Sequence, residues 1–400
     1  MGRALFISAP AEGHINPTLG IVRELINRGE EVIYFTSDNY KEKVEQTGAR
    51  VYTYHNFLES FLNQQATHFY ERVELILNSG RLLLPLVLDK LQGIQFDYII
   101  HDSMFGCGRL LAKAMRLPSI NSCTTFALTK TQYLHLEKGF LHNADEKAGT
   151  LIYARCLQLM KEIERRYGIR IQSNYEIFFN PAALTIVYTS KQFQPYGDHF
   201  DNSYKFIGPS LFHRSDKNEF DLESVRNSKV IYISMGTIYN NLPEFYKLCI
   251  HALKDINARI IISVGSQIDL EEFSEIPPNV SLEKKVAQLE ILKYTNVFIT
   301  HGGMNSVQEA LVNGVPLLMI PQGADQPIVS KRVVEFGAGI CFEKDTITSD
   351  LLRSAVEKLL NDQSYSTNSR NLGDSMTQTG GYLKAVDEIM TYTQSLVSHK

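Results

Sequence analysis

The sequence has few cysteines and no long apolar run. Its five cysteines are scattered, odd in number and form no C-x-x-C pair, which argues against a disulfide framework and a structural zinc site. The longest aliphatic stretch, Leu82 to Leu88, contains Pro85 and is far shorter than the ~20 residues needed to span a membrane. Glu12 interrupts the first apolar run, which therefore reads as a strand and not as a signal peptide. We expect a cytoplasmic protein with no stable membrane insertion.

An excess of positive charge is also missing. The formal net charge is −4 and the sequence pI is about 6.3. Because a surface that binds a duplex needs a basic stripe, we expect no nucleic-acid partner. Hydrophobic residues make up 44% and charged residues 21% of the chain, which is typical of a globular protein and not of a disordered one. Domains mostly contain ~100–200 residues, so a length of 400 residues predicts two of them.

Several nucleotide and metal motifs are absent. No G-x-G-x-x-G follows the first strand, and the chain contains neither G-x-x-x-x-G-K-[ST] nor G-x-S-x-G. These absences disfavour nicotinamide-binding, P-loop and α/β-hydrolase functions. The sequence also lacks an Asp-x-Asp pair and a histidine cluster with metal spacing. We therefore expect no metal and no cofactor.

What the chain does contain is an alternation of short β-branched runs and helical patterns, which is typical of parallel βαβ units. A segment with Gly208, Pro209 and a charged, serine-containing run separates two such halves, as a linker would. We predict an α/β protein with two Rossmann-like, doubly wound domains that face each other across a cleft. The expected bounds are an N-terminal domain at 1–206, a linker at 207–228, a C-terminal domain at 229–380 and a helix at 381–400 that packs back on the N-terminal domain.

The expected elements follow from this alternation. The first helix is predicted to begin at Pro17, since proline suits the first helical turn, and to end at Gly29. Further helices are expected near 243–255, 304–312 and 327–336, and long helix-patterned insertions at 55–90 and 125–180. The predicted strands are 4–8, 31–36, 98–100, 119–121, 184–188, 230–233, 259–263, 297–300 and 317–320.

Two polar residues in the first half are candidates for proton transfer. His14 lies in Gly13-His14-Ile15-Asn16-Pro17, directly after the first strand, and a neutral imidazole is a natural general base near pH 7. Asp102 follows a later strand of the same domain, from which a carboxylate can orient the imidazole. The alternatives are a loop histidine that caps a turn and an aspartate that caps a helix. Strand alternation directs His101, the neighbouring competitor, to the other face of the sheet.

The second half contains a candidate phosphate site at Thr300-His301-Gly302-Gly303-Met304-Asn305-Ser306, where a strand leads into a helix. Two glycines let a ligand approach the backbone, and the amides of a helix N-terminus attract an anion. Glu309 lies one helical turn further and is suited to a ribose diol; its alternative is a solvated helix carboxylate.

Two more loops of the second half follow predicted strands. Ser234-Met235-Gly236-Thr237 is a small-residue turn suited to a second phosphate contact. Asp325 and Gln326 offer a carboxylate and an amide, the pair of groups that suits sugar hydroxyls. The alternative for Asp325 is the capping of a helix that begins at Pro327.

Together these motifs resemble the UDP-dependent glycosyltransferases of GT-B fold, especially the bacterial macrolide and flavonoid type, over nearly the whole chain. The matching stretches are GHINP at 13–17, the strand that ends in Asp102, SMGT at 234–237, VAQLEIL at 286–292, HGGMNS at 301–306 and the pair Asp325-Gln326. The ordered combination is specific, whereas each string alone is weak.

The resemblance implies a role for each matching residue. His14 would deprotonate the acceptor hydroxyl, supported by Asp102, in a reaction that inverts the anomeric carbon and needs no metal. The N-terminal domain would bind the acceptor and the C-terminal domain the nucleotide sugar, which is a co-substrate. The implied donor contacts are Asn16; Thr124, Thr125, Gly236 and Thr237 near the phosphates; Val286 at the uracil; Gln288 at the nucleoside; His301, Gly303, Asn305 and Ser306 at the diphosphate; Glu309 at the ribose; and Asp325 and Gln326 at the sugar.

The chain departs from the family in one respect. Plant relatives carry Trp-x-Pro-Gln with the indole on the uracil, whereas this chain contains no tryptophan and has Lys285-Val286-Ala287-Gln288 there. The acceptor side matches no motif, but its aromatic residues suggest a flat, apolar acceptor, unless they form core. These residues are Phe57, Phe61, Phe69, Tyr70, Phe126 and Tyr133.

We therefore expect transfer of a sugar, glucose in the first instance, from a UDP-sugar to a hydroxyl of a hydrophobic small molecule such as a flavonoid or macrolide. One alternative is a lipid or cell-wall glycosyltransferase at the membrane surface, for which the run Leu82 to Leu88 is the candidate patch. The other is a UDP-sugar-binding protein or an epimerase, which would not transfer the sugar.

Overall fold

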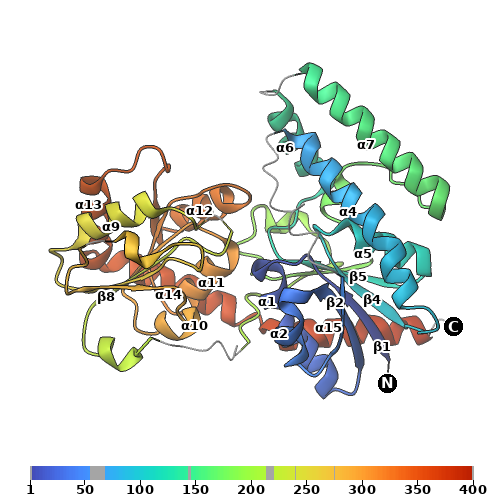
Figure 1. Cartoon of the computed structure of the whole chain (residues 1–400). Coiled ribbons are helices and arrows are strands. Elements are labelled where there is room, and N and C mark those ends of the chain that lie inside the picture. Colours follow the sequence, from blue (N-terminus) through green and yellow to red (C-terminus); the bar gives the residue numbers. More distant parts are fainter. Residues whose placement is uncertain are drawn as a thin grey trace. The chain divides into compact units, whose positions relative to one another are not determined.

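The computed structural model describes residues 2–54, 68–142, 146–212, 220–238, 240–273 and 275–398. The chain divides into two compact units (Figure 1). The first unit consists of Met1–Phe212 together with Gly380–Lys400, and the second consists of His213–Thr379.

The first unit is built on a seven-stranded parallel sheet in the order β3-β2-β1-β4-β5-β6-β7. The order reverses between β1 and β4, which is the point where open α/β sheets bind ligands. The strands are β1 (Arg3–Ile7), β2 (Glu31–Ser37), β3 (Arg50–Tyr54), β4 (Tyr98–Asp102), β5 (Ser119–Cys123), β6 (Leu184–Val187) and β7 (Tyr204–Phe206).

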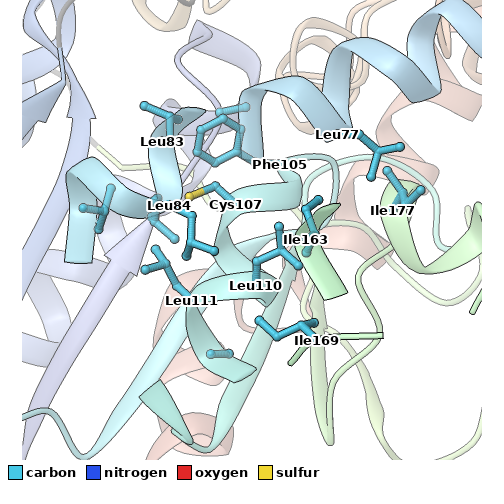
Figure 2. Close-up of a cluster of buried hydrophobic side chains, with 14 of the residues drawn as sticks. Leu77, Leu83, Leu84, Phe105, Cys107, Leu110, Leu111, Ile163, Ile169 and Ile177 are labelled. Atoms are coloured by element: carbon cyan, nitrogen blue, oxygen red, sulfur yellow. The ribbon is translucent and has the colours of Figure 1, made fainter. Parts of the chain in front are cut away.

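Helices cover both faces of this sheet, and alternate residues of each strand face opposite sides. On one face, Leu5 and Ile7 of β1 belong to the same buried cluster as residues of α4, α5, α7 and α8. Figure 2 shows part of this cluster, with Leu83 of α4 and Leu111 of α5 among its side chains. On the other face, Phe6 packs in a cluster with α1, α2 and α15. The helices of the unit are α1 (Glu12–Asn27), α2 (Lys41–Glu45), α4 (Phe69–Lys90), α5 (Gly106–Met115), α6 (Lys130–His142), α7 (Glu146–Tyr167), α8 (Tyr175–Phe178) and α15 (Gly381–Ser398).

The last helix, α15, belongs to the first unit although it follows the second unit in the sequence. Ile389 of α15 is fully buried in the cluster with α1. Gly20 of α1 permits this packing, because a Cβ there would lie 2.7 Å from Cγ of Tyr382. Arg28 Nη1 also donates to Asp387 Oδ1 at 2.6 Å, which ties the end of α1 to α15.

The second unit repeats the arrangement with six parallel strands in the order β10-β9-β8-β11-β12-β13. Here the order reverses between β8 and β11, the counterparts of β1 and β4. The strands are β8 (Val230–Ser234), β9 (Arg259–Ser263), β10 (Val280–Glu283), β11 (Val297–Thr300), β12 (Leu317–Met319) and β13 (Gly339–Cys341). The helices are α9 (Pro243–Leu253), α10 (Gln288–Ile291), α11 (Met304–Val312), α12 (Gln326–Glu335), α13 (Ser349–Asn361) and α14 (Gln363–Thr377).

The two parallel α/β sheets confirm the predicted fold class, although several elements differ from the prediction, among them five helices that were not predicted: α2, α5, α10, α13 and α14. Four strands, β3, β7, β10 and β13, were not predicted, and each lies at an edge of its sheet. Edge strands pack on fewer neighbours, so β3 and β7 are only partly buried and lack the apolar run that identifies a central strand. The first helix also begins at Glu12 and not at Pro17, which lies inside it.

Candidate active site

The reversal point of the first sheet brings His14 and Asp102 together. The chain leaves β1 and enters α1 at Glu12, so His14 lies in the first turn of the helix and not in a loop. Asp102 is the last residue of β4, the strand hydrogen-bonded to β1. His14 Nδ1 lies 2.7 Å from Asp102 Oδ2.

The two side chains of this pair differ in their exposure to solvent. The Asp102 side chain is completely buried, whereas 22% of the His14 side chain is exposed. Asp102 Oδ1 accepts a hydrogen bond from the Met104 N–H at 2.7 Å, so both carboxylate oxygens have partners. A carboxylate at Nδ1 favours the tautomer with the proton on Nδ1 and the lone pair on Nε2. The pair can therefore accept a proton at Nε2 and stabilise the resulting imidazolium.

Thr124 is a third partner of the imidazole. Its Oγ1 lies 3.1 Å from His14 Nδ1, and the residue is only 5% exposed. The family resemblance implied a phosphate contact for this hydroxyl, and nothing in the spacing of Thr124 from His14 indicated contact with the ring. The neighbouring Thr125 is half-buried. Asn16 is half-buried on α1, and its Oδ1 is buried without a hydrogen-bond partner among the described residues.

His101 lies on the opposite face of β4, as strand alternation predicted. A Cβ on Gly108 of α5 would lie 2.3 Å from the His101 Cβ, which places this side chain under α5. Burial lowers the pKa of His101 to about 4, so the ring is neutral near pH 7. His101 is thus a buried neutral residue separate from the His14–Asp102 pair.

In the second unit, His301 lies at the corresponding reversal point, directly after β11. A Cβ on Gly236, which follows β8, would lie 2.7 Å from His301 Cε1, and one on Gly303 would lie 2.4 Å from His301 Nε2. A Cβ at either position would therefore clash with the imidazole in its present orientation. Gly236 also has φ +80, a conformation that favours glycine. Thr237, which follows it, is exposed.

Burial sets the charge of this second imidazole. It lowers the pKa of His301 to about 4, so the ring is neutral near pH 7. The Thr300 hydroxyl lies 3.2 Å from His301 Nδ1. A neutral imidazole can donate one hydrogen bond to an anion without adding a full charge to the site.

Helix α11 begins beside this histidine. Its N-cap is Gly303, and no side chain caps the helix. The amides of the first turn can therefore bind an anion, which the positive end of the helix dipole stabilises. Asn305 and Ser306 lie in this turn and are half-buried. Gly302, the first of the two glycines expected to let a ligand approach the backbone, has φ +81, and a Cβ there would lie 2.3 Å from Ser330 Oγ.

Glu309 and Gln288 form a hydrogen-bonded pair. Gln288 Nε2 donates to Glu309 Oε2 at 2.6 Å and to Ser306 Oγ at 3.2 Å. Glu309 is 5% exposed, so the alternative of a solvated helix carboxylate is wrong. The residue before α10, Ala287, and Val286 are both buried. A ligand could reach Val286 through its backbone more readily than through its side chain.

The loop between β12 and α12 contains Asp325 and Gln326. Asp325 is the N-cap residue of α12, but its side chain makes no capping hydrogen bond to the helix. The alternative role, helix capping by the Asp325 carboxylate, is therefore wrong. Gln326 Oε1 accepts hydrogen bonds from the N–H groups of Gln322 and Gly323 at 2.7 and 3.2 Å. The Gln326 oxygen is thus committed to the loop backbone.

Known proteins share this architecture over the full chain. The sequence model of the family described as "Erythromycin biosynthesis protein CIII-like, C-terminal domain" matches residues 247–383. YojK of Bacillus subtilis (strain 168), described as an uncharacterized UDP-glucosyltransferase, is 33% identical over 98% of this chain and 97% of its own. The NDP-glycosyltransferase YjiC of Bacillus licheniformis is 35% identical over 96% of both chains. The chain belongs to the UDP-dependent glycosyltransferase family.

The fold of this glycosyltransferase agrees with that assignment. The crystal structure of the kitacinnamycin glycosyltransferase superposes with a TM-score of 0.85 at 27% identity and covers 97% of this chain and 98% of that one. The two sheets are thus those of a GT-B enzyme. The protein is an NDP-sugar-dependent glycosyltransferase that transfers sugars to small molecules, with an NDP-sugar donor and an aglycone acceptor.

The aromatic residues expected on the acceptor side of this glycosyltransferase are largely packed among themselves. Phe69 and Tyr133 have ring centroids 6.3 Å apart, and both pack against Phe178. Phe126 is 5% exposed and packs against Phe193, with the two ring centroids 5.5 Å apart. These contacts favour the core interpretation for the rings. Tyr70 is half-buried against Tyr153, and Phe57 and Phe61 lie outside the described residues.

Two further findings concern metals and membranes. Among the described residues of the glycosyltransferase, no group of three or more His, Cys, Asp or Glu side chains is arranged to hold a metal ion. No helix in the described ranges is both long and apolar enough to cross a membrane. The aliphatic run that suggested a membrane-surface patch lies in α4, where Leu83, Leu84 and Val87 are completely buried.

Proposed function

We propose that this glycosyltransferase transfers glucose from UDP-glucose to a hydroxyl group of a hydrophobic small molecule such as a flavonoid or macrolide. The observation that carries the proposal is the His14 Nδ1–Asp102 Oδ2 contact of 2.7 Å, with Asp102 buried and His14 partly exposed. A neutral imidazole oriented by a carboxylate is a general base, which is what an acceptor hydroxyl needs to become a nucleophile.

In the proposed step, His14 Nε2 takes the proton of the acceptor hydroxyl while its oxygen attacks the anomeric carbon. The bond between that carbon and the oxygen of the β-phosphate breaks, and UDP leaves with the electron pair. Attack opposite the leaving group inverts the anomeric configuration. The imidazolium that forms keeps its proton on Nδ1 and donates a hydrogen bond from it to Asp102 Oδ2, and the carboxylate stabilises the new charge.

The second unit would bind the donor without a metal. The leaving diphosphate would be stabilised by the first-turn amides of α11, by neutral His301 and by the hydroxyl of Ser306. Glu309, held by Gln288, would bind the ribose diol, and Asp325 the sugar. The other proposed donor contacts are Asn16, Thr125, Gly236, Thr237, Val286, Gly303 and Asn305.

Relatives support the nucleotide and the acceptor class. YojK is described as a UDP-glucosyltransferase and YjiC as an NDP-glycosyltransferase, which favours UDP-glucose as the donor. The matched family takes its description from erythromycin biosynthesis, which favours a macrolide among the acceptors. Lys285 stands where plant relatives stack a tryptophan on the uracil, so other nucleoside diphosphate sugars belong in any donor test.

The test is a panel of UDP- and TDP-sugars against one flavonol and one macrolide, read by product mass and by release of the nucleoside diphosphate. We expect a mass increase of one hexose with UDP-glucose and nucleotide release that depends on the acceptor. The His14→Ala protein serves as the matched control. Nucleotide-sugar turnover without an acceptor product, in both acceptor series, would contradict the proposal and favour hydrolysis or epimerisation.

A further inference from the structure

Three buried hydroxyl groups connect α1 to the sheet of the first unit. The Tyr34 hydroxyl of β2 donates a hydrogen bond to Ser8 Oγ at 2.8 Å, and its oxygen lies 3.0 Å from Thr18 Oγ1. All three residues are completely buried. Ser8 directly follows β1, and Thr18 belongs to α1. The Tyr34 hydroxyl therefore joins three elements of the first unit.

The direction of these hydrogen bonds follows from the number of hydrogens. A hydroxyl group has one hydrogen to donate and two lone pairs to accept with. Because Tyr34 gives its hydrogen to Ser8, Thr18 is the donor in its contact with Tyr34. Thr18 Oγ1 also donates to the Ile15 carbonyl oxygen at 2.8 Å, so it shares its hydrogen between two acceptors. The network thus reaches Ile15, the residue directly after His14.

The first turn of α1, which contains His14, has few hydrogen bonds from its own helix. Its N-cap residue is Ala11, and no side chain caps the helix. Pro17 lies inside the helix and has no N–H group to donate to the Gly13 carbonyl. Contacts from outside the helix therefore matter more for the placement of this turn than they do in a regular, capped helix.

The hydroxyl network is also close to the carboxylate partner of His14. Burial raises the pKa of the Tyr34 hydroxyl, and the negative charge of Asp102 raises it further. The Tyr34 hydroxyl is therefore protonated near neutral pH and lies within electrostatic range of Asp102. The ion pair between Lys43 and Glu12 also holds the first turn of α1, but both of its side chains are partly exposed. Such pairs contribute little to placement.

We propose that Tyr34 is a positioning residue, whose hydroxyl group fixes the first turn of α1 through Thr18 and thereby sets the position of the His14 imidazole against Asp102. The inference rests on the proposed function in one respect, namely that His14 is the general base. Because Tyr34 is completely buried, it acts through α1 and not by contact with a substrate. A shift of about 1 Å in a reacting group can lower a rate about 10²-fold, so a small displacement of this turn has a measurable effect.

The first test is Tyr34→Phe, which removes the hydroxyl group and keeps the ring that stacks on Phe6 with centroids 4.8 Å apart. We expect kcat for transfer from UDP-glucose to a flavonol to fall about 3- to 30-fold. The KM for UDP-glucose should stay within about 2-fold of wild type, because the base is displaced and the donor contacts are not. An unchanged kcat would overturn the proposal.

Tyr98→Phe is the matched control for the loss of a buried tyrosine hydroxyl. Tyr98 is the first residue of β4 in the same sheet and is 2% exposed. Its hydroxyl donates to Glu30 Oε2 at 3.0 Å. We expect kcat to stay within about 2-fold of wild type, because this hydrogen bond does not involve α1. Equal losses of kcat in Tyr34→Phe and Tyr98→Phe would contradict the proposal, since they would show a general effect on the sheet.

The Thr18 hydroxyl provides a second pair of variants. Thr18→Val removes this hydroxyl at similar shape and should reproduce the loss of kcat, whereas Thr18→Ser keeps the hydroxyl and should restore most of it. Combining Thr18→Val with Tyr34→Phe should lower kcat less than about 3-fold beyond either single variant, because the two hydroxyls act as one chain. If the losses multiply, the two groups act independently and the proposal is wrong.

Nitrogen NMR of labelled histidine tests the placement without reference to transfer. The Nδ1 signal of His14 is assigned by its loss in His14→Ala and reports on the hydrogen bond to Asp102. It should shift in Tyr34→Phe and stay in place in Tyr98→Phe. An unchanged signal in Tyr34→Phe would refute the positioning role even if kcat falls. If wild type shows no transfer from UDP-glucose while the signal shifts as expected, the proposed function fails and the positioning role stands.

Discussion

The two units place different chemistry at the same point of the same topology. In the first unit the order of the strands reverses between β1 and β4, and in the second between β8 and β11. The first reversal point carries His14 after β1 and Asp102 at the end of β4. The second carries Gly236 after β8 and His301 after β11.

The neighbour of each histidine determines what the histidine can do. His14 has a buried carboxylate 2.7 Å from Nδ1, which favours a protonated Nδ1 and a basic Nε2. His301 instead lies against two glycines, and burial lowers its pKa to about 4. The first arrangement suits proton transfer, and the second suits a neutral donor to an anion. A shared sheet topology thus gives the two histidines equivalent positions, while their different neighbours set their different chemistry.

The strongest test of this difference is His14→Ala. We expect transfer to hydroxyl acceptors to fall about 10²- to 10⁴-fold, the usual contribution of a general base. UDP affinity should stay nearly unchanged, because His14 itself is not among the proposed UDP contacts and the helix amides proposed to hold the diphosphate belong to the other unit. Initial rates on a flavonol and calorimetry with UDP check both statements. Activity above a tenth of wild type would remove His14 from the role of base.

The matching change in the second unit is Gly303→Val. Its Cβ would lie 2.4 Å from His301 Nε2, so either the imidazole or the start of α11 must shift. We expect UDP affinity to fall at least about 10-fold, because the anion site depends on both. Gly13→Ala is the control, since a Cβ at Gly13 meets nothing within 4 Å and should leave UDP affinity unchanged. A melting curve shows whether Gly303→Val still folds.

Acid should destabilise the protein through its buried neutral histidines. Burial lowers the folded-state pKa of both His101 and His301 to about 4, below the value of 6.5 for an unfolded histidine. The unfolded chain therefore binds more protons at lower pH, and stability is lost as the pH falls from about 6.5 towards 4, by about 1.4 kcal/mol per unit of pKa difference for each group. His101→Leu should flatten this fall in urea titrations between pH 7 and 5. An unchanged slope would show that His101 does not contribute.

Thr124 is relevant to this comparison because it contacts the imidazole of His14, the proposed base in the first unit. We expect Thr124→Val to lower kcat about 3- to 10-fold, as for the loss of one hydrogen bond, and Thr124→Ser to restore it. The KM for UDP-glucose should not change. A raised KM with unchanged kcat would instead assign Thr124 to the donor phosphates, as the motif resemblance implies.

The smallest expected effect is that of metal removal. The proposed diphosphate contacts are amides, a neutral imidazole and hydroxyl groups, which act without an ion. Turnover with UDP-glucose should therefore change at most a few-fold in excess EDTA. A complete loss that magnesium reverses would show that the phosphate site has been assigned wrongly. Asp325 would then be the first residue to reassign as a metal ligand.

The sequence predicted the central strands because these are buried on both faces and consist of continuous apolar runs. It missed the four edge strands for the same reason, since β7 (Tyr204–Phe206) and β13 (Gly339–Cys341) are short and partly exposed. The start of α1 was predicted five residues late, because a proline that suits a first turn also occurs at Pro17 inside this helix. Element type was thus easier to predict than element limits.

For the site, the sequence by itself determined which polar residues follow which strands, and therefore that His14, Asp102 and His301 lie at the carboxyl ends of parallel strands. Only the tertiary structure decided which atoms meet. The Thr124 hydroxyl on His14, the Gln288–Glu309 pair and the Gln326 oxygen on its own loop each depend on side-chain orientations. The physical reason is that sequence patterns report on residues close together along the chain, whereas these contacts join residues that are brought together by folding. Strand patterns reflect local burial, whereas a hydrogen bond between residues 14 and 124 depends on strand order, which sequence periodicity does not encode.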